Sequence, residues 1–339
     1  MTLLIPAVLS FIATFVLVLF VKEYMFESGV VAMDHNKKDK PTLPSGCGIA
    51  AAMGFTIGIL AYAFGGSFNL YLPVASLVTL FALSLSVVLV SLVGLLDDMN
   101  VKSAPVRTTD MSDTRKGLKQ WQKPVITLLG AIPLIAINAG NSIVTLPFIG
   151  ALNFGIFYPL IIIPLAVIFA SNAFNLLGGF DGIATGTGLI AAIALLIYSI
   201  FFGTYTGALI SGVIVATLVV FFAFNIYPSR LIPGDSFTYF VGTALVADMI
   251  IGNMEAFGLI VFAPWIIEFV LHAIRKFKVT DLGKPRKDGT MEPPYGKRVY
   301  SWTHLLMNLK PSKEWEISAY MWLVEIAFVL IAFAAVAMH

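Results

Sequence analysis

Two adjacent carboxylates end a long apolar stretch of this sequence. The run from Pro73 to Leu96 is followed directly by Asp97 and Asp98. Like charges at this spacing repel each other, and a bound divalent cation removes that cost. Proteins commonly hold Mg²⁺ with one or two carboxylates together with the phosphates of a substrate. The pair therefore indicates a metal or phosphate site, unless it is simply the hydrated end of a helix.

Other polar segments carry further parts of such a site. Asn175 and Asp235 offer hard oxygen atoms to Mg²⁺, and the ammonium of Lys123 can bind phosphate oxygens. Glycines allow close backbone approach to a ligand, and the helices that start near them favour anions. A Walker-type phosphate loop is absent from the sequence, so ATP hydrolysis is not indicated. The glycines are Gly178, Gly179, Gly182 and Gly234.

The composition places these segments in a membrane protein. Of 339 residues, 58% are hydrophobic and only 12% are charged, and the mean hydropathy is +0.91. A soluble domain is far less apolar than this. The apolar runs are continuous and not alternating, which predicts membrane-spanning helices. The single cysteine, Cys47, excludes an internal disulfide.

We expect one all-α polytopic domain, residues 1–339, with ten transmembrane helices. The first helix has no basic segment before it and no small-residue cleavage site after it, so it is predicted to be retained and not removed as a signal peptide. The predicted spans are Leu3–Val21, Ile49–Phe64, Pro73–Leu96, Val125–Asn138, Ile156–Ala170, Ile183–Phe202, Ala208–Phe224, Phe237–Ile251, Ala256–Ile274 and Ile317–Met338.

Basic residues fix the predicted orientation. When the loops are placed alternately on the two sides, all 21 Lys and Arg residues fall on one side, which the positive-inside rule makes cytoplasmic. Both termini are then predicted to lie outside, and the active-site cleft is expected at the cytoplasmic face. The cytoplasmic loops are 22–48, 97–124, 171–182, 225–236 and 275–316.

Taken in order, these loops resemble those of the polyprenyl-phosphate N-acetylhexosamine-1-phosphate transferases. The resemblance covers the chain from Asp34 to about Arg298. It consists of Asp-Asp after a span, Asn-Ala-x-Asn before a Gly-rich turn, and Asn-x-x-Pro before Gly-Asp-Ser. These motifs stand here at Asp97-Asp98, Asn172–Asn175, Asn225–Pro228 and Gly234–Ser236.

Details of these motifs look like the dolichyl-phosphate branch of the family. The stretch Gly234-Asp235-Ser236-Phe237-x-Tyr239-Phe240 is similar to that branch, and Gly178 stands where the peptidoglycan enzymes carry a further aspartate. One feature departs from the pattern. Twenty-four residues lie between Asp98 and Lys123, more than the branch usually has, so Lys119 and Lys116 remain rivals for the role of Lys123.

The resemblance implies a Mg²⁺-dependent phosphoglycosyltransferase, with Mn²⁺ as a possible substitute. Such an enzyme transfers GlcNAc-1-phosphate from UDP-GlcNAc to a polyprenyl (dolichyl-type) phosphate and releases UMP, the first step of lipid-linked oligosaccharide assembly for N-glycosylation. Such an enzyme acts with a membrane lipid and binds no nucleic acid, and a homodimer is compatible with this function. The implied residues are Asp97, Asp98 and Lys123 in catalysis, Asp235, Asn175 and Asp98 at the metal, and Lys37, Asn172, Asp181, Arg275, Lys278 and Arg286 at the substrate.

Plainer roles remain open for several of these residues. Asp235, Asn175 and Asp181 stand at helix ends, where they could act as caps. Lys37 and the basic residues of the last loop, Arg275, Lys278 and Arg286, could be solvated positive-inside charges.

Acids inside or beside the predicted spans also need an interpretation. Glu268 and His272 are four residues apart on one helix and are expected to form a structural pair. Asp248 and Glu255 are expected to be hydrated at the outer end of their spans.

Other functions also stay open. A related transferase could use another UDP-N-acetylhexosamine for cell-wall or surface glycans. A secondary transporter should have its polar residues near the bilayer midplane, and not at one face as here. A CDP-alcohol phosphotransferase should have an Asp-Gly-x-x-Ala-Arg series, which is missing after Asp181-Gly182.

Overall fold

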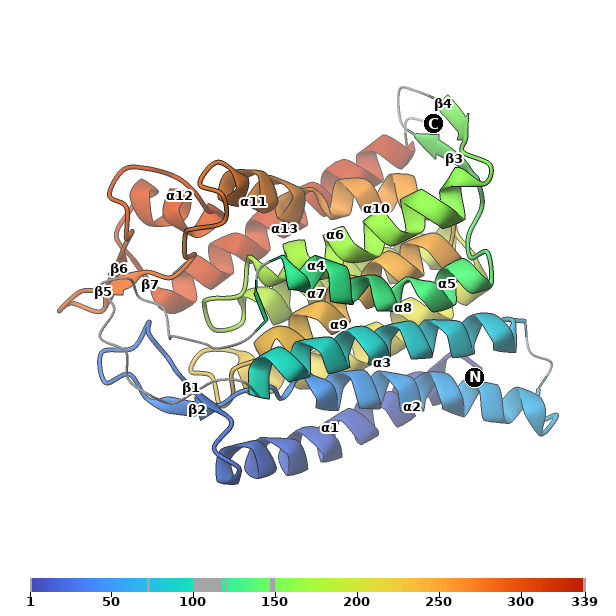
Figure 1. The fold of residues 1–339 in the computed structure, drawn as a ribbon, viewed down its shortest axis with the longest axis horizontal. Coiled ribbons are helices and arrows are strands. Elements are labelled where there is room, and N and C mark those ends of the chain that lie inside the picture. Colours follow the sequence, from blue (N-terminus) through green and yellow to red (C-terminus); the bar gives the residue numbers. More distant parts are fainter. Residues whose placement is uncertain (1, 72–73, 100–117, 120, 147–149, 338–339) are drawn as a thin grey trace.

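The computed structural model describes residues 2–71, 74–99, 118–119, 121–146 and 150–337. Most of this chain is helical, and the long helices pack side by side into one bundle (Figure 1). The helices are α1 (Leu4–Glu27), α2 (Gly48–Ser67), α3 (Leu77–Met99), α4 (Gln122–Thr127), α5 (Ile132–Ala136), α6 (Ile163–Asn175), α7 (Ile183–Phe201), α8 (Tyr205–Asn225), α9 (Gly234–Ile251), α10 (Glu255–Val261), α11 (Ala263–Ala273), α12 (Trp302–Leu309) and α13 (Glu314–Ala337).

Short turns and three small antiparallel sheets complete the described fold. A 3₁₀ turn, η1 (Leu128–Gly130), joins α4 to the segment before α5, and a π-helical turn, η2 (Tyr158–Ile162), leads into α6. The sheets are β1–β2, β3–β4 and β5–β6–β7. Their strands are β1 (Val31–Met33), β2 (Thr42–Pro44), β3 (Ile143–Leu146), β4 (Gly150–Asn153), β5 (Lys284–Pro285), β6 (Thr290–Glu292) and β7 (Ser312–Lys313).

The structure confirms a helical polytopic membrane protein, but it does not establish the count of ten spans. In the described chain, seven helical segments are long and apolar enough to cross a membrane, or eight if α10 and α11 form one span bent by 56°. Pro264 follows this bend, as expected where a proline interrupts a helix. The other two predicted spans correspond to α9 and to the interrupted segment α4–η1–α5, so the count of ten remains a prediction.

The outer surface of the bundle is suited to lipid. Along α1, Leu4, Ile12 and Phe20 are 65%, 52% and 68% exposed, and they alternate with buried positions such as Val18. An apolar face of this length would be unfavourable in water and is favourable against hydrocarbon chains.

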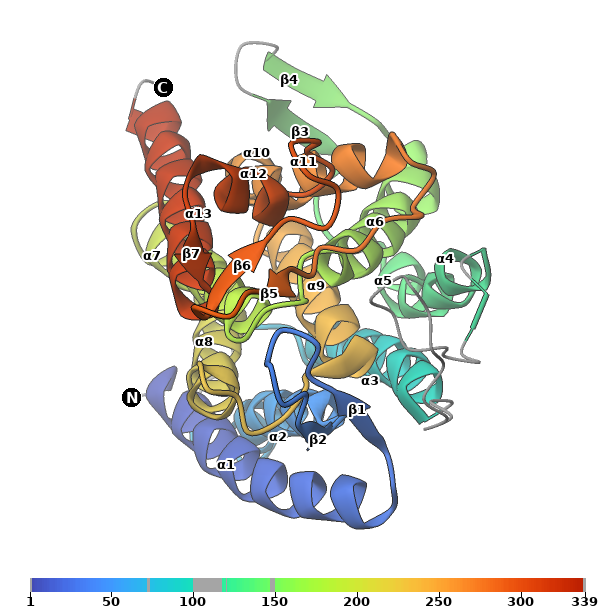
Figure 2. The same ribbon diagram turned by 90° about the vertical axis from the view of Figure 1, so that its left-hand side faces the viewer.

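The central helix of the bundle is α9. Figure 2 views the bundle from one end and shows α9 near its middle, with α3, α6 and α8 around it. Two glycines allow its neighbours to approach closely. A Cβ on Gly94 of α3 would lie 2.5 Å from the carbonyl oxygen of Asp235, and one on Gly242 of α9 would lie 2.4 Å from that of Ala170. Small residues at such crossings are typical of helix packing in membranes.

The polar connections lie at one end of the bundle. Hairpin β1–β2, strands β5–β7 and α12 lie together at the left-hand end in Figure 1, and the β3–β4 hairpin lies at the opposite end. We call the first of these the polar end and define it as residues 28–47, 176–182, 226–233 and 274–313. The ends of α3 and α6 and the start of α9 point toward it, so the helices deliver Asp97, Asn175 and Asp235 to one region.

Two acids lie at the opposite end, and one of them, Asp248, is buried and not hydrated, contrary to the prediction. Asp248 on α9 is 0% exposed and accepts a hydrogen bond from the hydroxyl of Ser211 on α8. Glu255 at the start of α10 is half-buried and accepts a hydrogen bond from Tyr158. Because a carboxyl group is costly inside a membrane protein, each of these two has a polar partner on a neighbouring helix.

The packing of α3 on α9 can be tested with two alanine substitutions. Gly94→Ala should lower stability by roughly 1–3 kcal/mol, because the new methyl group would collide with the backbone of α9. Gly212→Ala on α8 is the matched control, since its methyl group would meet only Leu196, at 3.8 Å. Thermal unfolding in detergent measures the stability of both variants. Equal unfolding temperatures for the two variants would contradict this packing.

Candidate active site

A half-buried ammonium joins the two carboxylates that the sequence places far apart. Nζ of Lys123 lies 2.9 Å from Oδ2 of Asp97 and 2.6 Å from Oδ2 of Asp235. Burial alone would lower the pKa of Lys123, but the negative charges of Asp235 and Asp97 outweigh burial and raise this pKa above its usual value. The group therefore remains a cation at neutral pH. The backbone N–H of Leu118 donates to Oδ1 of Asp97 at 2.6 Å and fixes the other side of that carboxylate.

This geometry supports Lys123 over one of its two rivals. Lys119 is exposed, and its backbone N–H donates to the side chain of Gln122. Lys116 lies outside the described residues. The long spacing between Asp98 and Lys123 therefore does not prevent Lys123 from reaching the acids.

Asp98 holds the start of α9. Its two carboxylate oxygens accept hydrogen bonds from the backbone N–H groups of Asp235, at 2.8 Å, and Ser236, at 3.0 Å. These N–H groups have no partner within their own helix, and a carboxylate there also interacts favourably with the helix dipole. The left-handed conformation of Gly234, with φ +77°, brings the chain within reach, since a Cβ there would lie 2.5 Å from Asp98. The geometry thus favours a capping role for Asp98, and metal binding by this residue remains a prediction.

A cavity of about 360 Å³ opens beside these residues at the polar end. Asn175 from the end of α6 and Asp235 from the start of α9 both line it, and Oδ1 of Asn175 accepts a hydrogen bond from Thr238 at 2.8 Å. The other walls come from the β1–β2 hairpin, the turn between α6 and α7, and the segment Thr280–Leu282. Two predicted metal ligands, Asn175 and Asp235, therefore face the same space.

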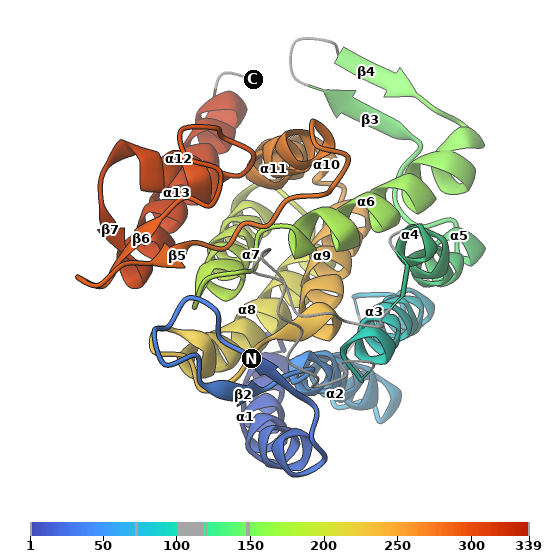
Figure 3. The same ribbon diagram turned by 60° about the vertical axis from the view of Figure 1, so that its left-hand side comes forward.

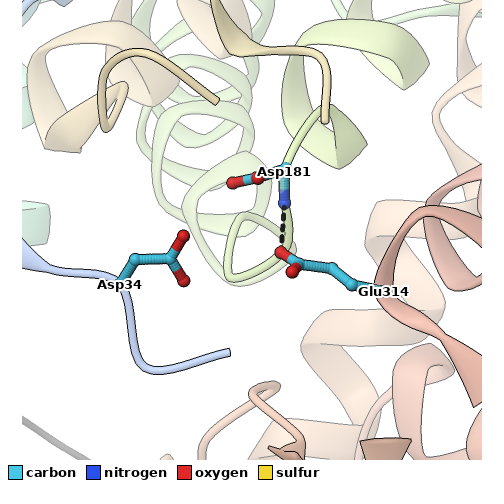
Figure 4. Close-up of side chains that lie close together, drawn as sticks. All are labelled: Asp34, Asp181 and Glu314. Atoms are coloured by element: carbon cyan, nitrogen blue, oxygen red, sulfur yellow. Dashed lines mark hydrogen bonds between the residues drawn. The ribbon is translucent and has the colours of Figure 1, made fainter. Parts of the chain in front are cut away.

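Lys37 neutralises a second group of acids at the edge of this cavity. Its Nζ lies 3.0 Å from Asp34, 2.7 Å from Asp181 and 2.5 Å from Glu314. Figure 4 shows the three carboxyl groups, which come from the β1–β2 hairpin, the turn before α7 and the start of α13. Burial alone would lower the pKa of Lys37. The negative charges of Glu314 and Asp181 together have the larger effect, so the pKa lies above its usual value.

The arrangement of these three carboxylates could also suit a metal ion, since one oxygen of each lies within 4.8 Å of the others. The ammonium of Lys37 already provides the positive charge between them. Asp181 also accepts the N–H of Ser229 at 2.9 Å, so it links α7 to the segment before α9. Lys37 and Asp181 therefore lie together at the edge of the cavity, and substrate binding by either residue remains a prediction.

Four predicted substrate residues lie away from the cavity. Asn172 donates to the carbonyl of Ile168 at 2.8 Å and to Thr127 at 3.2 Å, so it packs α6 against α4. Arg275, Lys278 and Arg286 are exposed; Arg275 lies over the ring of Tyr300, and Arg286 pairs loosely with Glu292 at 3.4 Å. None of the four is among the residues that line the described cavity.

Several residues of the site could not be identified from the sequence. Asn36 and Asp281 at the polar end, and Glu314 at the start of α13, reach the site through contacts between distant segments, which leave no periodic pattern. The Gly178-Gly179 pair was the only sequence signal, because adjacent glycines indicate close approach of another group. The predicted pair Glu268–His272 is confirmed, with 3.0 Å between Oε1 and Nε2.

Comparison with known proteins identifies the class to which this fold and site belong. Residues 80–253 match the family model described as glycosyl transferase family 4, and the chain belongs to this family. A Saccharolobus solfataricus protein is 33% identical over 98% of this chain and 96% of its own length. It carries the provisional name UDP-N-acetylglucosamine–dolichyl-phosphate N-acetylglucosaminephosphotransferase.

Two further relatives extend the comparison. A Sulfolobus acidocaldarius protein with the same provisional name is 30% identical over 97% of this chain and 94% of its own length. A phospho-N-acetylmuramoyl-pentapeptide-transferase of Limosilactobacillus fermentum is 29% identical over 73% of this chain and 70% of its own.

The central ion pair can be tested through stability. Lys123→Met should lower stability by about 3 kcal/mol, because it leaves two buried carboxylates facing each other without a cation. The double variant Lys123→Met/Asp97→Asn should recover part of this loss, since only one of the two charges remains. Lys119→Met is the matched control on an exposed lysine. Unfolding temperatures in detergent would contradict the ion-pair geometry if Lys123→Met matched the control.

Proposed function

We propose that this protein transfers GlcNAc-1-phosphate from UDP-GlcNAc to a polyprenyl (dolichyl-type) phosphate, which gives the lipid-diphospho-sugar and UMP. The observation that carries this proposal is the contact of Lys123 with Asp97 and Asp235 beside a cavity lined by Asn175, in a chain of glycosyl transferase family 4. The names of the Saccharolobus solfataricus and Sulfolobus acidocaldarius relatives support the same reaction. In the cell this would be the first step of lipid-linked oligosaccharide assembly.

The reaction joins two phosphates and breaks one existing bond. An oxygen of the lipid phosphate attacks the β-phosphorus of UDP-GlcNAc, and the bond from that phosphorus to UMP breaks with its electron pair on UMP. A phosphate monoester has a second pKa near 6, so the attacking group is already charged at pH 7 and direct attack needs no strong base. We propose that Lys123 stabilises the negative charge on the reacting phosphates and that Asp97 orients the lipid phosphate.

The donor atoms at the cavity suit a Mg²⁺ ion. Asp235 contributes a carboxylate and Asn175 an amide oxygen, which are hard ligands of the kind that Mg²⁺ accepts together with substrate phosphates. We propose these two residues as the protein ligands, with Mn²⁺ as a possible substitute. When bound there, the ion would neutralise part of the negative charge of the diphosphate. Asp98 is a weaker candidate because each of its oxygens already accepts a hydrogen bond from the start of α9, and because it is not among the residues that line the described cavity.

An apolar cavity between the helices supports a lipid substrate. About 540 Å³ of space lies among side chains of η2, α6, α9 and α10, and it extends to Val144 of β3 and to Glu255, toward the end opposite the polar end. Its walls are almost entirely hydrocarbon, as a polyprenyl chain would need.

The orientation in the membrane is part of the proposal. We propose that the polar end faces the cytoplasm and that both termini lie outside, because all lysines and arginines of the ten-span arrangement fall on the side of the polar end. UDP-sugars would then reach the cavity from the cytoplasm. A secondary transporter is disfavoured, since the paired acids lie at one end of the bundle and not at its midplane.

The sugar of the UDP-sugar donor differs between two branches of the family. The relative from Limosilactobacillus fermentum keeps open another UDP-N-acetylhexosamine donor that serves cell-wall synthesis. Release of UMP from a panel of UDP-sugars with polyprenyl phosphates would decide between these donors, and wild-type protein that releases UMP with none of them would overturn the proposed function.

Asp235→Asn tests the metal and catalytic roles directly. It should cut kcat roughly 100-fold or more, the loss expected when a major electrostatic stabiliser of phosphoryl transfer is removed. Raised Mg²⁺ or Mn²⁺ should restore part of the rate. The control is Asp39→Asn, which neutralises an exposed acid of the β1–β2 hairpin loop. A folded Asp235→Asn protein with the wild-type rate and metal optimum is incompatible with the mechanism.

Cysteine labelling tests the orientation. The one native cysteine, Cys47, is fully buried, so introduced cysteines report without background. A membrane-impermeant thiol reagent should label Lys287→Cys only from the cytoplasmic side and Asn141→Cys only from outside, since both positions are exposed and lie at opposite ends of the bundle. Labelling of both from the same side would contradict the proposed topology.

A further inference from the structure

An aspartate from the loop after α11 reaches the wall of the cavity. Oδ2 of Asp281 accepts the backbone N–H groups of Gly178 at 3.2 Å and Gly179 at 2.7 Å. Asp281 lines the same cavity as Asn175 and Asp235. A Cβ on Gly179 would lie 2.6 Å from Oδ1 of Asp281, so only glycine allows the carboxylate to rest on this turn.

Buried hydrogen bonds from α12 hold the segment that carries Asp281. The hydroxyl of Thr303 donates to the carbonyl of Asp281 at 2.6 Å, and Nε2 of His304 donates to the carbonyl of Thr280 at 2.9 Å. Both side chains are 0% exposed. Glu268 of α11 in turn accepts the N–H of Trp302 at 2.9 Å, which anchors the start of α12. Figure 3 shows α12 and β5–β7 grouped beside α13.

A second contact fixes this segment from the opposite side. Nδ2 of Asn36, in the β1–β2 hairpin loop, donates to the carbonyl of Gly179 at 2.6 Å, and its Oδ1 accepts the N–H of Gly283 at 3.3 Å. Asn36 is 4% exposed. Asp281 is therefore held from three chain segments, which is the arrangement of a side chain preorganised toward a ligand.

The carboxylate of Asp281 is charged under ordinary conditions. Burial and the nearby charge of Glu268 raise its pKa to about 6, while His272 and the N–H of Gly179 oppose that rise. A charged carboxylate repels a diphosphate and attracts hydrogen-bond donors. Since each carboxylate oxygen can accept about two hydrogen bonds, Oδ1 retains acceptor capacity in a residue that lines the cavity.

We infer that Asp281 accepts a hydrogen bond from a hydroxyl or amide N–H on one of the two sugar rings of the bound nucleotide sugar, and so determines substrate specificity. This inference rests on the proposed function. It assigns to Asp281 the neutral donor groups of the substrate, and leaves the diphosphate to Lys123 and to the metal ion that Asn175 and Asp235 would hold. The two possible sources of the donor are the transferred sugar and the ribose.

Asp281→Asn combined with substrate analogues tests this assignment. The variant should lower kcat/KM for UDP-GlcNAc roughly 10- to 100-fold, as expected when a hydrogen bond to a charged acceptor is weakened. It should leave the KM for the lipid phosphate unchanged. Each analogue lacks one donor: the acetamido group, a hydroxyl at carbon 3, 4 or 6 of the sugar, or a ribose hydroxyl. For the analogue that lacks the recognised donor, wild type and variant should have equal kcat/KM.

The comparison separates recognition from a structural role. A loss of folded protein lowers the rates of all substrates by one factor, so a penalty that is equal for every analogue would overturn the inference. Wild-type kcat/KM for UDP-GlcNAc in Asp281→Asn would also overturn it. The matched control is Asp288→Asn, an exposed acid in the same loop, which should behave as wild type.

Binding measurements distinguish failure of this inference from failure of the proposed function. Calorimetry with UDP-GlcNAc and its analogues needs no turnover, and the Asp281→Asn penalty in affinity should vanish for the same analogue. If wild type binds UDP-GlcNAc but releases no UMP, the proposed function fails while the role of Asp281 is still measured. If wild type does not bind UDP-GlcNAc, both are overturned.

Discussion

The contact between Asp98 and the first N–H groups of α9 determines the geometry of the candidate site. It joins the last turn of α3 to the first turn of α9, and Gly94 allows the two helices to lie close enough for this contact. Asp97 and Asp235 are thereby placed on either side of Lys123. Because a charged acceptor at a helix N-terminus is both a hydrogen-bond partner and a favourable partner for the helix dipole, one side chain fixes both position and orientation.

The sequence predicted that Asp97, Asp98 and Asp235 lie close together, but it could not assign separate roles to Asp97 and Asp98. Adjacent residues of a helix point about 100° apart, so only one of two neighbours can face a given partner. Which of them faces Lys123 depends on the rotation of α3 against α9, and Gly94 is the α3 residue at which the two helices pack most closely in the described chain. Loss of activity at position 98 would consequently reflect the placement of α9 as much as any chemistry.

The helices themselves were predictable where an apolar run is continuous, and each predicted span overlaps a helical segment. Prediction was weaker at α4–η1–α5, where Pro133 and a 3₁₀ turn interrupt the helix, and at α9, which carries two acids. Asp281 and Asn36 could not be predicted, because their roles arise from loop contacts that follow no period. The basic loop residues were selected for charge, and Arg275, Lys278 and Arg286 lie in solvent beyond the cavity.

The wall formed by Asn36, Gly179 and Gly283 also has a consequence for the order in which the molecule assembles. Asn36 bonds to partners 143 and 247 positions away in the sequence. Closing loops of that length costs chain entropy, and contacts between residues close in sequence do not offset this cost. The wall can therefore form only on helices that are already packed. The chain regains the same entropy when the wall opens, so heating favours its loss. Substrate recognition should therefore disappear at a lower temperature than the helical bundle itself.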